Sequence, residues 1–338
     1  MRAVGVHRYL PIEHPESLLD VELPEPSPGP RDLRVRVRAV AVNPVDVKVR
    51  APKPRVEETP RVLGWDAAGV VEAVGAEVTT FRPGDQVYYA GSITRPGCNA
   101  EVHLVDERIA ARMPRSLGFA DAAALPLTAL TAWEGLFERL GLSPDGRDAG
   151  RSLLVIGGAG GVGSMVIQLA KAAGLHVVAT ASREESRAWA RALGADLVVD
   201  HTAPLRPQIE AAGLGYVERI FNTQSTEAWW DTMADLAAPL GRIVGIVETS
   251  GPVDLGKLTS KSVSFAWELM FTRAIYETPD MAAQQEILAR VAAWVDEGRI
   301  RSTRREHLGR IDAANLRAAH ARIESGRTVG KVVLEGWD

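Results

Sequence analysis

The sequence predicts an α/β protein that joins a mostly antiparallel β domain to a doubly wound parallel sheet. Short β-type runs punctuated by Pro and Gly fill the chain up to about Pro114, and strand and helix alternate from Ser152 onward. Repeated β-α units with continuously apolar strands are typical of a parallel sheet covered on both faces. With 338 residues, the chain is also too long for one compact core and suits two domains.

The β character of the first region comes from alternating apolar and polar residues. Arg34, Arg36 and Arg38 alternate with apolar residues within the run Leu33–Val42. This period of two is typical of a strand with one buried and one solvated face, which we favour over a basic binding patch. Turn signals such as Pro83-Gly84-Asp85 separate the runs. The other strands expected here are Gly69–Val74, Gln86–Ala90 and Glu101–Val105.

The middle of the chain is expected to form the parallel sheet. A helical stretch rich in Ala and Leu, Asp121–Leu140, leads into the apolar strand Leu153–Ile156, a glycine-rich turn and the helix Val162–Ala173. A helix that ends near Leu193 follows the second strand. The further strands expected are Val177–Thr180, Leu197–Val199, Val217–Phe221 and Ile243–Val247.

The β-α regularity ends around Ser262–Phe265. Beyond it the sequence predicts a helix near Met281–Val295 and a terminal strand Lys331–Leu334, and this last part is expected to return to the first domain. The predicted boundaries are therefore 1–122 and 266–338 for the two parts of the β domain, and 123–265 for the parallel-sheet domain.

Composition and charge argue against several classes of function. A formal net charge of -4 favours neither nucleic acid nor an anionic membrane as a partner. Cys98 is the only cysteine, so neither an intrachain disulfide nor a multi-thiolate metal site can form. The first residues lack the apolar core of a signal peptide, and no run approaches the roughly twenty apolar residues that span a bilayer. We therefore expect a cytoplasmic protein.

A glycine motif follows the first strand of the parallel-sheet domain. Gly158, Gly160 and Gly163 form G-x-G-x-x-G between the strand Leu153–Ile156 and a helix that opens near Val162, which is the setting of a dinucleotide-binding loop. We expect Gly158 to permit the tight turn, Gly160 to let a pyrophosphate approach and Gly163 to let helix and strand pack closely. Free N–H groups at the helix start then meet the anion. The alternative is a tight glycine turn that binds no ligand.

The end of the next strand bears on the choice of nicotinamide cofactor. A chain that selects NAD usually has Asp or Glu there to hold the ribose 2′-hydroxyl, whereas this strand runs into Thr180, Ser182 and Arg183. A hydroxyl and a guanidinium would bind a 2′-phosphate that a carboxylate would repel, so the sequence favours NADPH. Alternatively, Ser182 with Glu185 forms a capping box that starts the helix, and both roles can coexist.

Five segments that together span nearly the whole chain resemble motifs of the medium-chain dehydrogenase/reductase superfamily. Members of that superfamily have a GroES-like β domain built from both chain ends and an inserted Rossmann domain, so the resemblance implies this fold here. The chain is most similar to the quinone oxidoreductase branch and, within it, to bacterial zinc-type alcohol dehydrogenase-like proteins, which share the runs Tyr88–Gly97 and Ser262–Arg273. The five segments are Ala41–Asp46, Gly64–Val71, Pro83–Asp85, Gly157–Gly163 and Gly330–Leu334.

The departures from that family concern zinc. Zinc-dependent relatives carry Cys where this chain has Asn43, and Gly-His-Glu where it has Gly64-Trp65-Asp66. Trp65 has no atom that ligates zinc and Asn43 is a poor ligand, so we expect no metal site. The cysteine cluster of the structural zinc lobe is also missing. His103 lies in an expected strand, where we favour a structural contact over a ligand role.

Without a metal ion, a conjugated acceptor suits the site better than a simple aldehyde. A quinone or an α,β-unsaturated carbonyl spreads the negative charge after a hydride arrives, so modest hydrogen bonds suffice. The expected function is therefore hydride transfer from NADPH to such an acceptor. The two alternatives are a zinc-type alcohol dehydrogenase and a non-catalytic NADPH-binding protein similar to the crystallins of this branch.

Asn43, Asp46 and Trp65 are the candidate catalytic residues. By position, Asn43 is the expected hydrogen-bond donor and Asp46 is expected to orient the ribose or a proton path. Each has a structural alternative, because Asn43-Pro44 is a good turn and Asp46 could cap the next turn. Trp65 could line a flat apolar pocket, although aromatic residues more often belong to the core. Its expected partners in that pocket are Trp267, Met270 and Phe271.

The cofactor residues combine the glycine loop with positions that the resemblance implies. Thr128 and Thr131 are expected near the nicotinamide, although Thr131 could instead bond its own helix, and Lys331 near the phosphates. The resemblance also implies a homodimer joined through the Rossmann sheets. The full expected cofactor set is Thr128, Thr131, Gly158, Ala159, Gly160, Gly161, Val162, Gly163, Ser182, Arg183, Asn222, Thr223, Gly245, Ile246, Val247 and Lys331.

Overall fold

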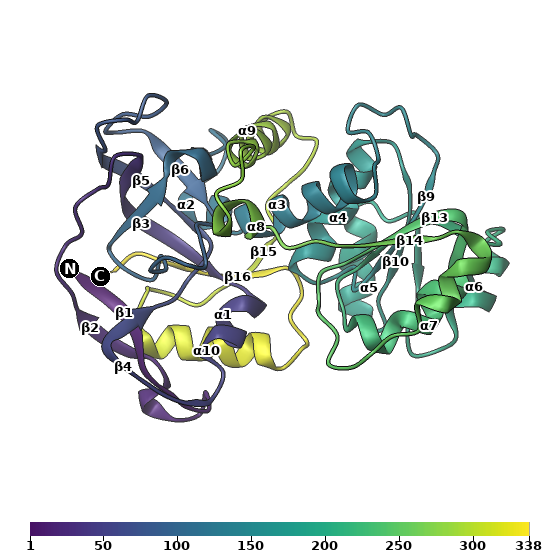
Figure 1. Ribbon diagram of the computed structural model, residues 1–338, viewed down its shortest axis with the longest axis horizontal. Coiled ribbons are helices and arrows are strands. Elements are labelled where there is room, and N and C mark those ends of the chain that lie inside the picture. Colours follow the sequence, from purple (N-terminus) through teal and green to yellow (C-terminus); the bar gives the residue numbers. More distant parts are fainter. Residues whose placement is uncertain (338) are drawn as a thin grey trace. The chain divides into compact units, whose positions relative to one another are not determined.

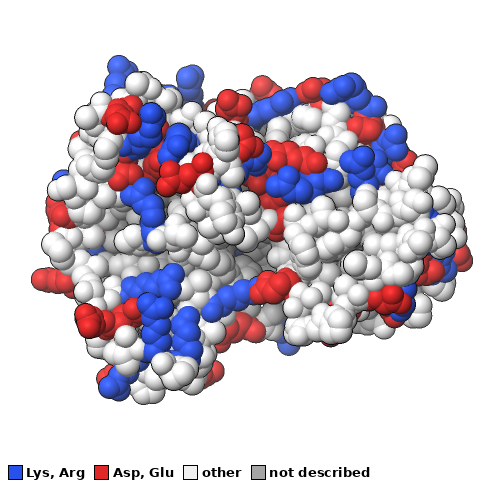
Figure 2. Space-filling model, in the orientation of Figure 1, with Lys and Arg blue, Asp and Glu red and all other residues white. Residues whose placement is uncertain are grey.

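The computed structural model describes residues 1–337, and the chain divides into two compact units. The first unit contains Met1–Leu130 and the residues from Phe271 onward, and the second contains Thr131–Met270. Each unit contains its own sheet system (Figure 1). On the face drawn in Figure 2, side chains of both charge signs are interspersed over each unit.

The first unit is built on a seven-strand sheet in the order β15-β16-β3-β5-β6-β8, with β7 paired to β3. Its pairs are antiparallel except for β15 with β16. The alternating arginines of β3 are half-buried or exposed and the intervening Leu33, Val35 and Val37 are fully buried, which confirms the expected one-sided strand. The strands are β3 (Asp32–Val42), β5 (Ala67–Val74), β6 (Gln86–Tyr89), β7 (Val102–Asp106), β8 (Ala110–Arg112), β15 (Arg304–His307) and β16 (Lys331–Glu335).

A second, three-strand antiparallel sheet and five helices complete this unit. The sheet order is β2-β1-β4, and none of its strands was expected from the sequence. Their bounds are β1 (Arg2–Tyr9), β2 (Leu19–Glu22) and β4 (Lys53–Val62). The helices are α1 (Pro44–Arg50), α2 (Phe119–Ala123), α8 (Thr272–Ile275), α9 (Ala283–Asp296) and α10 (Ala313–Glu324).

The second unit contains a six-strand parallel sheet in the order β11-β10-β9-β12-β13-β14. This is the doubly wound order of a dinucleotide-binding fold. Helices α4 to α7 pack against its strands (Figure 1). The strands are β9 (Ser152–Ile156), β10 (His176–Thr180), β11 (Leu197–Val199), β12 (Val217–Asn222), β13 (Ala237–Gly245) and β14 (Ser264–Trp267). The helices are α4 (Gly161–Ala172), α5 (Glu184–Ala192), α6 (Leu205–Ala211) and α7 (Thr226–Leu236).

Two expectations about this sheet are wrong. The β-α pattern does not end at Ser262–Phe265, because Ser264–Trp267 forms β14, which pairs in parallel with β13. Its residues are exposed or half-buried, as an edge strand requires, so the continuous apolar run of an inner strand is missing. β13 also ends at Gly245, so Ile246 and Val247 lie beyond the strand.

The helical stretch expected over Asp121–Leu140 consists of three pieces. After α2, α3 (Pro126–Trp133) begins at Pro126 and passes directly into a π-helical turn, Glu134–Arg139. Turns of this type are rare and often lie at functional sites. No helix among residues 1–337 combines the length and the apolarity that a membrane span requires.

Candidate functional site

The glycine-rich loop connects β9 to α4. The sequence suggested that Gly158 permits the tight turn. The turn instead requires glycine at Gly157, whose φ is +84°. A Cβ on Gly158 would lie 2.8 Å from the Cβ of Ala179, and one on Gly163 would lie 2.2 Å from the Gly157 carbonyl oxygen. Both glycines are therefore required by packing.

Gly160 differs from its neighbours because no atom of the protein crowds it. A Cβ there would meet only the Gly157 carbonyl oxygen, at an ordinary 3.6 Å. Gly160 is also the residue before the first turn of α4, and it provides no side chain to cap that helix. The uncapped N–H groups at this helix start, beside a surface left bare by glycine, suit an anion that approaches the backbone.

Ser182 and Arg183 follow β10 at the same edge of the sheet. Helix α5 begins at Glu184 with Arg183 as its N-cap residue, so the alternative in which Ser182 caps the helix is wrong. Glu184 lies within the first turn and is exposed. Thr180 at the end of β10 accepts a hydrogen bond of 2.9 Å from the Gly157 N–H, and this contact ties β10 to the glycine loop.

The carboxyl ends of the other strands come together in register. Asn222 at the end of β12 is aligned with Ile156 of β9 and with Gly245 of β13, and Gly245 is aligned with Trp267 of β14. Thr223 donates a 2.8 Å hydrogen bond to the Ile156 carbonyl oxygen. This edge is where doubly wound sheets bind their ligands.

Two of the expected cofactor residues form side-chain hydrogen bonds with nearby backbone groups. The buried amide of Asn222 closes the turn after β12, accepting from the Gln224 N–H at 3.0 Å and donating to the Gln224 carbonyl at 3.0 Å. Thr128 donates to the Leu125 carbonyl at 3.0 Å within the first unit. Thr131 is buried in the second unit.

The first unit contains a buried polar cluster made of Asn43, Asp66 and Lys331, which we call the amide–lysine cluster. Lys331 Nζ donates to the Val42 carbonyl at 3.1 Å, to Asp66 Oδ2 at 2.9 Å and to Asn43 Oδ1. Asn43 Nδ2 donates to the same Asp66 oxygen at 2.9 Å, and Asp66 Oδ1 accepts from the Leu127 N–H at 2.8 Å. All three side chains are almost fully buried.

The amide–lysine cluster contains two of the expected site residues, Asn43 and Lys331. Both ends of the Asn43 amide are hydrogen-bonded within the protein, and its expected donation to a reacting oxygen stays a prediction. The Lys331 ammonium has three protein acceptors within the first unit, and its expected binding of the cofactor phosphates stays a prediction. Asp66 was not among the candidate residues, although an acid beside the apolar run from Ala67 is a signal for a buried charge.

Asp46 lies next to this cluster and is completely buried. Its Oδ2 accepts a 2.7 Å hydrogen bond from the Asn43 N–H, so Asp46 caps the start of its own helix α1 and not the next turn. Its Oδ1 has no hydrogen-bond partner. Burial raises the pKa of Asp46 to about 7, outweighing the Asn43 hydrogen bond and the charge of Lys331, both of which lower it. A carboxyl with this pKa exchanges its proton near neutral pH.

Trp65 is buried and is held by the loop between β6 and β7. Its indole N–H donates to the Ser92 carbonyl at 3.1 Å, and its ring meets Phe271 edge-on at 6.4 Å between centroids. Met270, which is buried, and Trp267, which is 48% exposed, belong to the second unit. The Trp65–Phe271 contact lies within the first unit, and the apolar pocket expected around Trp65 stays a prediction.

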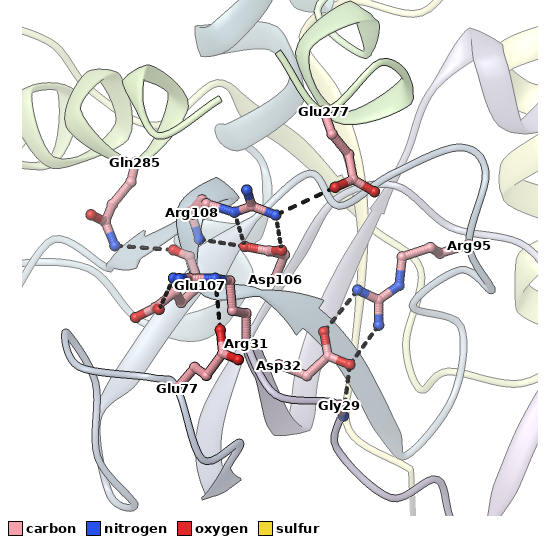
Figure 3. Close-up of polar contacts among 10 residues, drawn as sticks. All are labelled: Gly29, Arg31, Asp32, Glu77, Arg95, Asp106, Glu107, Arg108, Glu277 and Gln285. Carbon is pink, nitrogen blue, oxygen red and sulfur yellow. Dashed lines mark hydrogen bonds and ion pairs between the residues drawn. The ribbon is translucent and has the colours of Figure 1, made fainter. Parts of the chain in front are cut away.

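Two contacts fix the loop that holds Trp65. Arg95 donates to both oxygens of Asp32, at 2.8 and 3.0 Å, as Figure 3 shows together with the neighbouring ion pairs. His103 Nε2 donates to the Pro96 carbonyl at 3.0 Å, and its Nδ1 lies 3.1 Å from the Tyr89 hydroxyl. Burial lowers the pKa of His103 to about 4, so the ring is neutral at physiological pH. His103 has the structural role expected for it.

The residues at the amide–lysine cluster do not fit a zinc ion. The Asp66 carboxylate is already shared by an ammonium, an amide and a backbone N–H, and the Trp65 indole N–H can only donate. The nearby Cys98 thiol donates towards the Asp66 carbonyl, and burial raises its pKa, so it is no thiolate ligand. Within residues 1–337, no three His, Cys, Asp or Glu side chains are grouped so that they could hold a metal ion.

Comparisons with known proteins agree with this architecture. The chain matches the alcohol dehydrogenase GroES-like domain over residues 29–128 and the zinc-binding dehydrogenase family over residues 161–284. It is 42% identical to a zinc-type alcohol dehydrogenase-like protein of Staphylococcus aureus, over 86% of this chain and 87% of the relative. It is 32% identical to the 2-methylene-furan-3-one reductase of Solanum lycopersicum, over 86% of this chain and 68% of that enzyme.

Solved structures show the same relationship. A Rhizobium etli protein assigned as a zinc-dependent alcohol dehydrogenase superposes with a TM-score of 0.95 at 50% identity, covering 100% of this chain and 98% of that one. The Escherichia coli quinone oxidoreductase, solved in complex with NADPH, superposes with a TM-score of 0.83 at 25% identity, covering 99% and 100%. Since relatives above 30% identity match along most of their length, the chain belongs to the medium-chain dehydrogenase/reductase superfamily and is an NAD(P)-dependent oxidoreductase.

Proposed function

We propose that the protein transfers a hydride from NADPH to a quinone or an α,β-unsaturated carbonyl, and that it does so without zinc. The observation that carries this proposal is the amide–lysine cluster. The Asn43 amide and the Asp66 carboxylate are hydrogen-bonded to Lys331 and to each other. They stand at positions where zinc-dependent relatives carry metal-site residues. A site of this composition offers ordinary side chains to the reacting oxygen, and a conjugated acceptor needs no more.

The preference for NADPH rests on the end of β10. Ser182 and Arg183 are half-buried there, and the structure leaves Ser182 outside the helix cap. A hydroxyl and a guanidinium can both donate to a 2′-phosphate, and the guanidinium adds charge-assisted hydrogen bonds. The quinone oxidoreductase of Escherichia coli, which shares this fold, was solved with NADPH.

When bound, the reduced nicotinamide supplies the hydride, and the acceptor then requires one proton. Asp46 is our candidate for holding that proton, because its pKa is about 7 and its buried Oδ1 has no other partner. We assign Asn43 to positioning: its backbone N–H holds Asp46, and its side chain joins Asp66 and Lys331. Trp65 would form an apolar wall next to Phe271.

Steady-state oxidation of NADPH against a panel of quinones, enones and simple aldehydes tests the proposal. We expect turnover with conjugated acceptors that exceeds turnover with saturated aldehydes, in protein purified without chelators and free of zinc by elemental analysis. One tightly held zinc per chain, with preferred turnover of alcohols, would instead support a zinc-type alcohol dehydrogenase. Tight NADPH binding without turnover of any acceptor would support a non-catalytic NADPH-binding protein.

A further inference from the structure

Two glutamates outside the candidate site are buried next to each other in the second unit. Glu134 begins the π-helical turn and is 1% exposed, and Glu268 directly follows β14 and is 3% exposed. Arg139, the last residue of the turn, places its Nε 2.9 Å from Glu268 Oε2. We call these three residues the carboxyl pair and its arginine.

The protonation of the carboxyl pair follows from its surroundings. Burial is the largest cause that raises the pKa of Glu268, to about 9, and the charge and hydrogen bond of Glu134 add to it. Arg139 lowers this pKa, and the charge of Glu138 raises it further. With one proton between the two carboxyls, the charges of the pair and its arginine cancel. With none, two buried carboxylates share one guanidinium and repel each other.

The carboxyl pair connects two segments that contain expected cofactor residues. The Glu268 N–H donates to the Gly245 carbonyl at 3.0 Å, which extends the pairing of β13 with β14 by one residue. Glu134 lies one helical turn after Thr131. The π-helical turn is also packed against β12, because a Cβ on Gly135 would lie 2.3 Å from the Phe221 ring. Separation of the two carboxyls would therefore shift these segments relative to each other.

We propose that Glu134 and Glu268 share one proton and thereby position the ligand-binding edge of β13 and β14, so that loss of this proton to solvent base weakens dinucleotide binding. Both are positioning residues, since they act through the Thr131 segment and Gly245 and need not touch the cofactor. The inference rests on the proposed function only in taking NADPH as the dinucleotide. The ionisation changes no oxidation state, and solvent base accepts the proton.

The test is the dissociation constant of NADPH, measured by fluorescence titration from pH 7 to about pH 10, a range set by the raised pKa. The wild-type protein should lose about tenfold in affinity over this range, the effect of one pKa unit of coupling. Glu268→Gln replaces the protonated carboxyl by a neutral donor, so it should bind like wild type at pH 7 and show no alkaline loss. Glu210→Gln, at an exposed position of α6 in the same unit, is the control and should behave as wild type.

An alkaline loss of the same size in Glu268→Gln, or no loss in the wild type, would overturn the inference. Should Glu268→Gln fail to fold, Glu134→Gln replaces it, because it also removes the repulsion between two carboxylates. If NADPH binds at no pH, the proposed cofactor fails instead. The shared proton is then tested by urea unfolding: between pH 4.5 and 9 the wild type should lose stability relative to Glu268→Gln as the pH rises, and parallel curves would refute it.

Discussion

At the scale of single residues, Arg183 is the side chain to which we assign the preference for the 2′-phosphate. We predict that Arg183→Ala weakens NADPH binding by about tenfold to a hundredfold, because a hydrogen bond to a charged group contributes about 1.5–3 kcal/mol. NADH binding should change little, since the phosphate is its only difference from NADPH. Calorimetric titration of both dinucleotides measures this. Arg191→Ala is the matched control, because Arg191 is an exposed arginine of the same helix α5. Equal losses for both cofactors would contradict the assignment.

Asp46 should impose a pH dependence on turnover. A proton donor must be protonated before the reaction, so the rate should fall as the pH rises through about 7, the pKa of Asp46. Asp46→Asn removes the proton and should lower turnover by about a hundredfold, the usual contribution of general acid catalysis, while flattening this pH profile. NADPH affinity, measured on the same variant, should stay within a few-fold. A rate profile unchanged by the substitution would assign the proton to water or another group.

At the scale of elements, the amide–lysine cluster joins three parts of the β domain. Asn43 follows β3, Asp66 precedes β5 and Lys331 begins β16, so the ion pair of Lys331 and Asp66 links segments distant in sequence. Lys331→Met leaves Asp66 buried without its cation, and we predict a loss of about 3–5 kcal/mol in the free energy of unfolding. Adding Asp66→Asn should restore part of it. Urea unfolding of both variants measures these changes in the free energy of unfolding. Losses that simply add in the double variant would show that the two side chains do not interact.

Helix α10 contains a buried histidine that should destabilise the protein in acid. Neither ring nitrogen of His320 has a hydrogen-bond partner, and burial, with a smaller effect of Arg50, lowers its pKa to about 3. His320 therefore binds a proton in the unfolded chain but not in the folded chain, and stability falls as the pH drops below 6.5. At pH 5 this loss is about 2 kcal/mol.

The substitution His320→Leu should remove that part of the acid sensitivity. Urea unfolding at pH 7 and pH 5 should show a smaller difference for this variant than for the wild type, while His201→Gln, at an exposed position, should match the wild type. Asp46 acts in the opposite direction, because its raised pKa makes the folded state the better proton acceptor between pH 3.8 and about 7. The comparison must therefore be made between variants and not from the wild-type curve alone.

At the scale of the whole molecule, the homodimer implied by the family resemblance stays a prediction. β14 is an end strand of the parallel sheet, and Leu269 just beyond it is 53% exposed. Sedimentation should give twice the chain mass of 36.4 kDa. Leu269→Lys should shift the equilibrium towards monomer, whereas Val56→Lys, at a position of the first unit that is 61% exposed, should leave it unchanged. A wild-type monomer would contradict the prediction.

Much of the fold could be predicted because local patterns encode it. Period-two alternation located β3, and the strand, glycine turn and helix located the dinucleotide-binding loop. The missed elements carry weaker local signals. β4 contains two prolines and a charged middle, and β14 is an edge strand with no fully buried residue. Their strand geometry comes from pairing with another strand: β4 pairs with β1, and β14 pairs with β13.

The sequence by itself determined the superfamily, the two kinds of sheet and the position of the glycine-rich loop, because these depend on residue identity at fixed local spacing. Only the tertiary structure decided which buried polar groups pair with one another. Asn43 and Lys331 lie far apart in the chain, yet each occupies the other's hydrogen-bonding groups. The pairing of Glu134 with Glu268 has no sequence signal either. A buried polar group takes whichever partner folding brings within reach, and that choice is made across the whole chain.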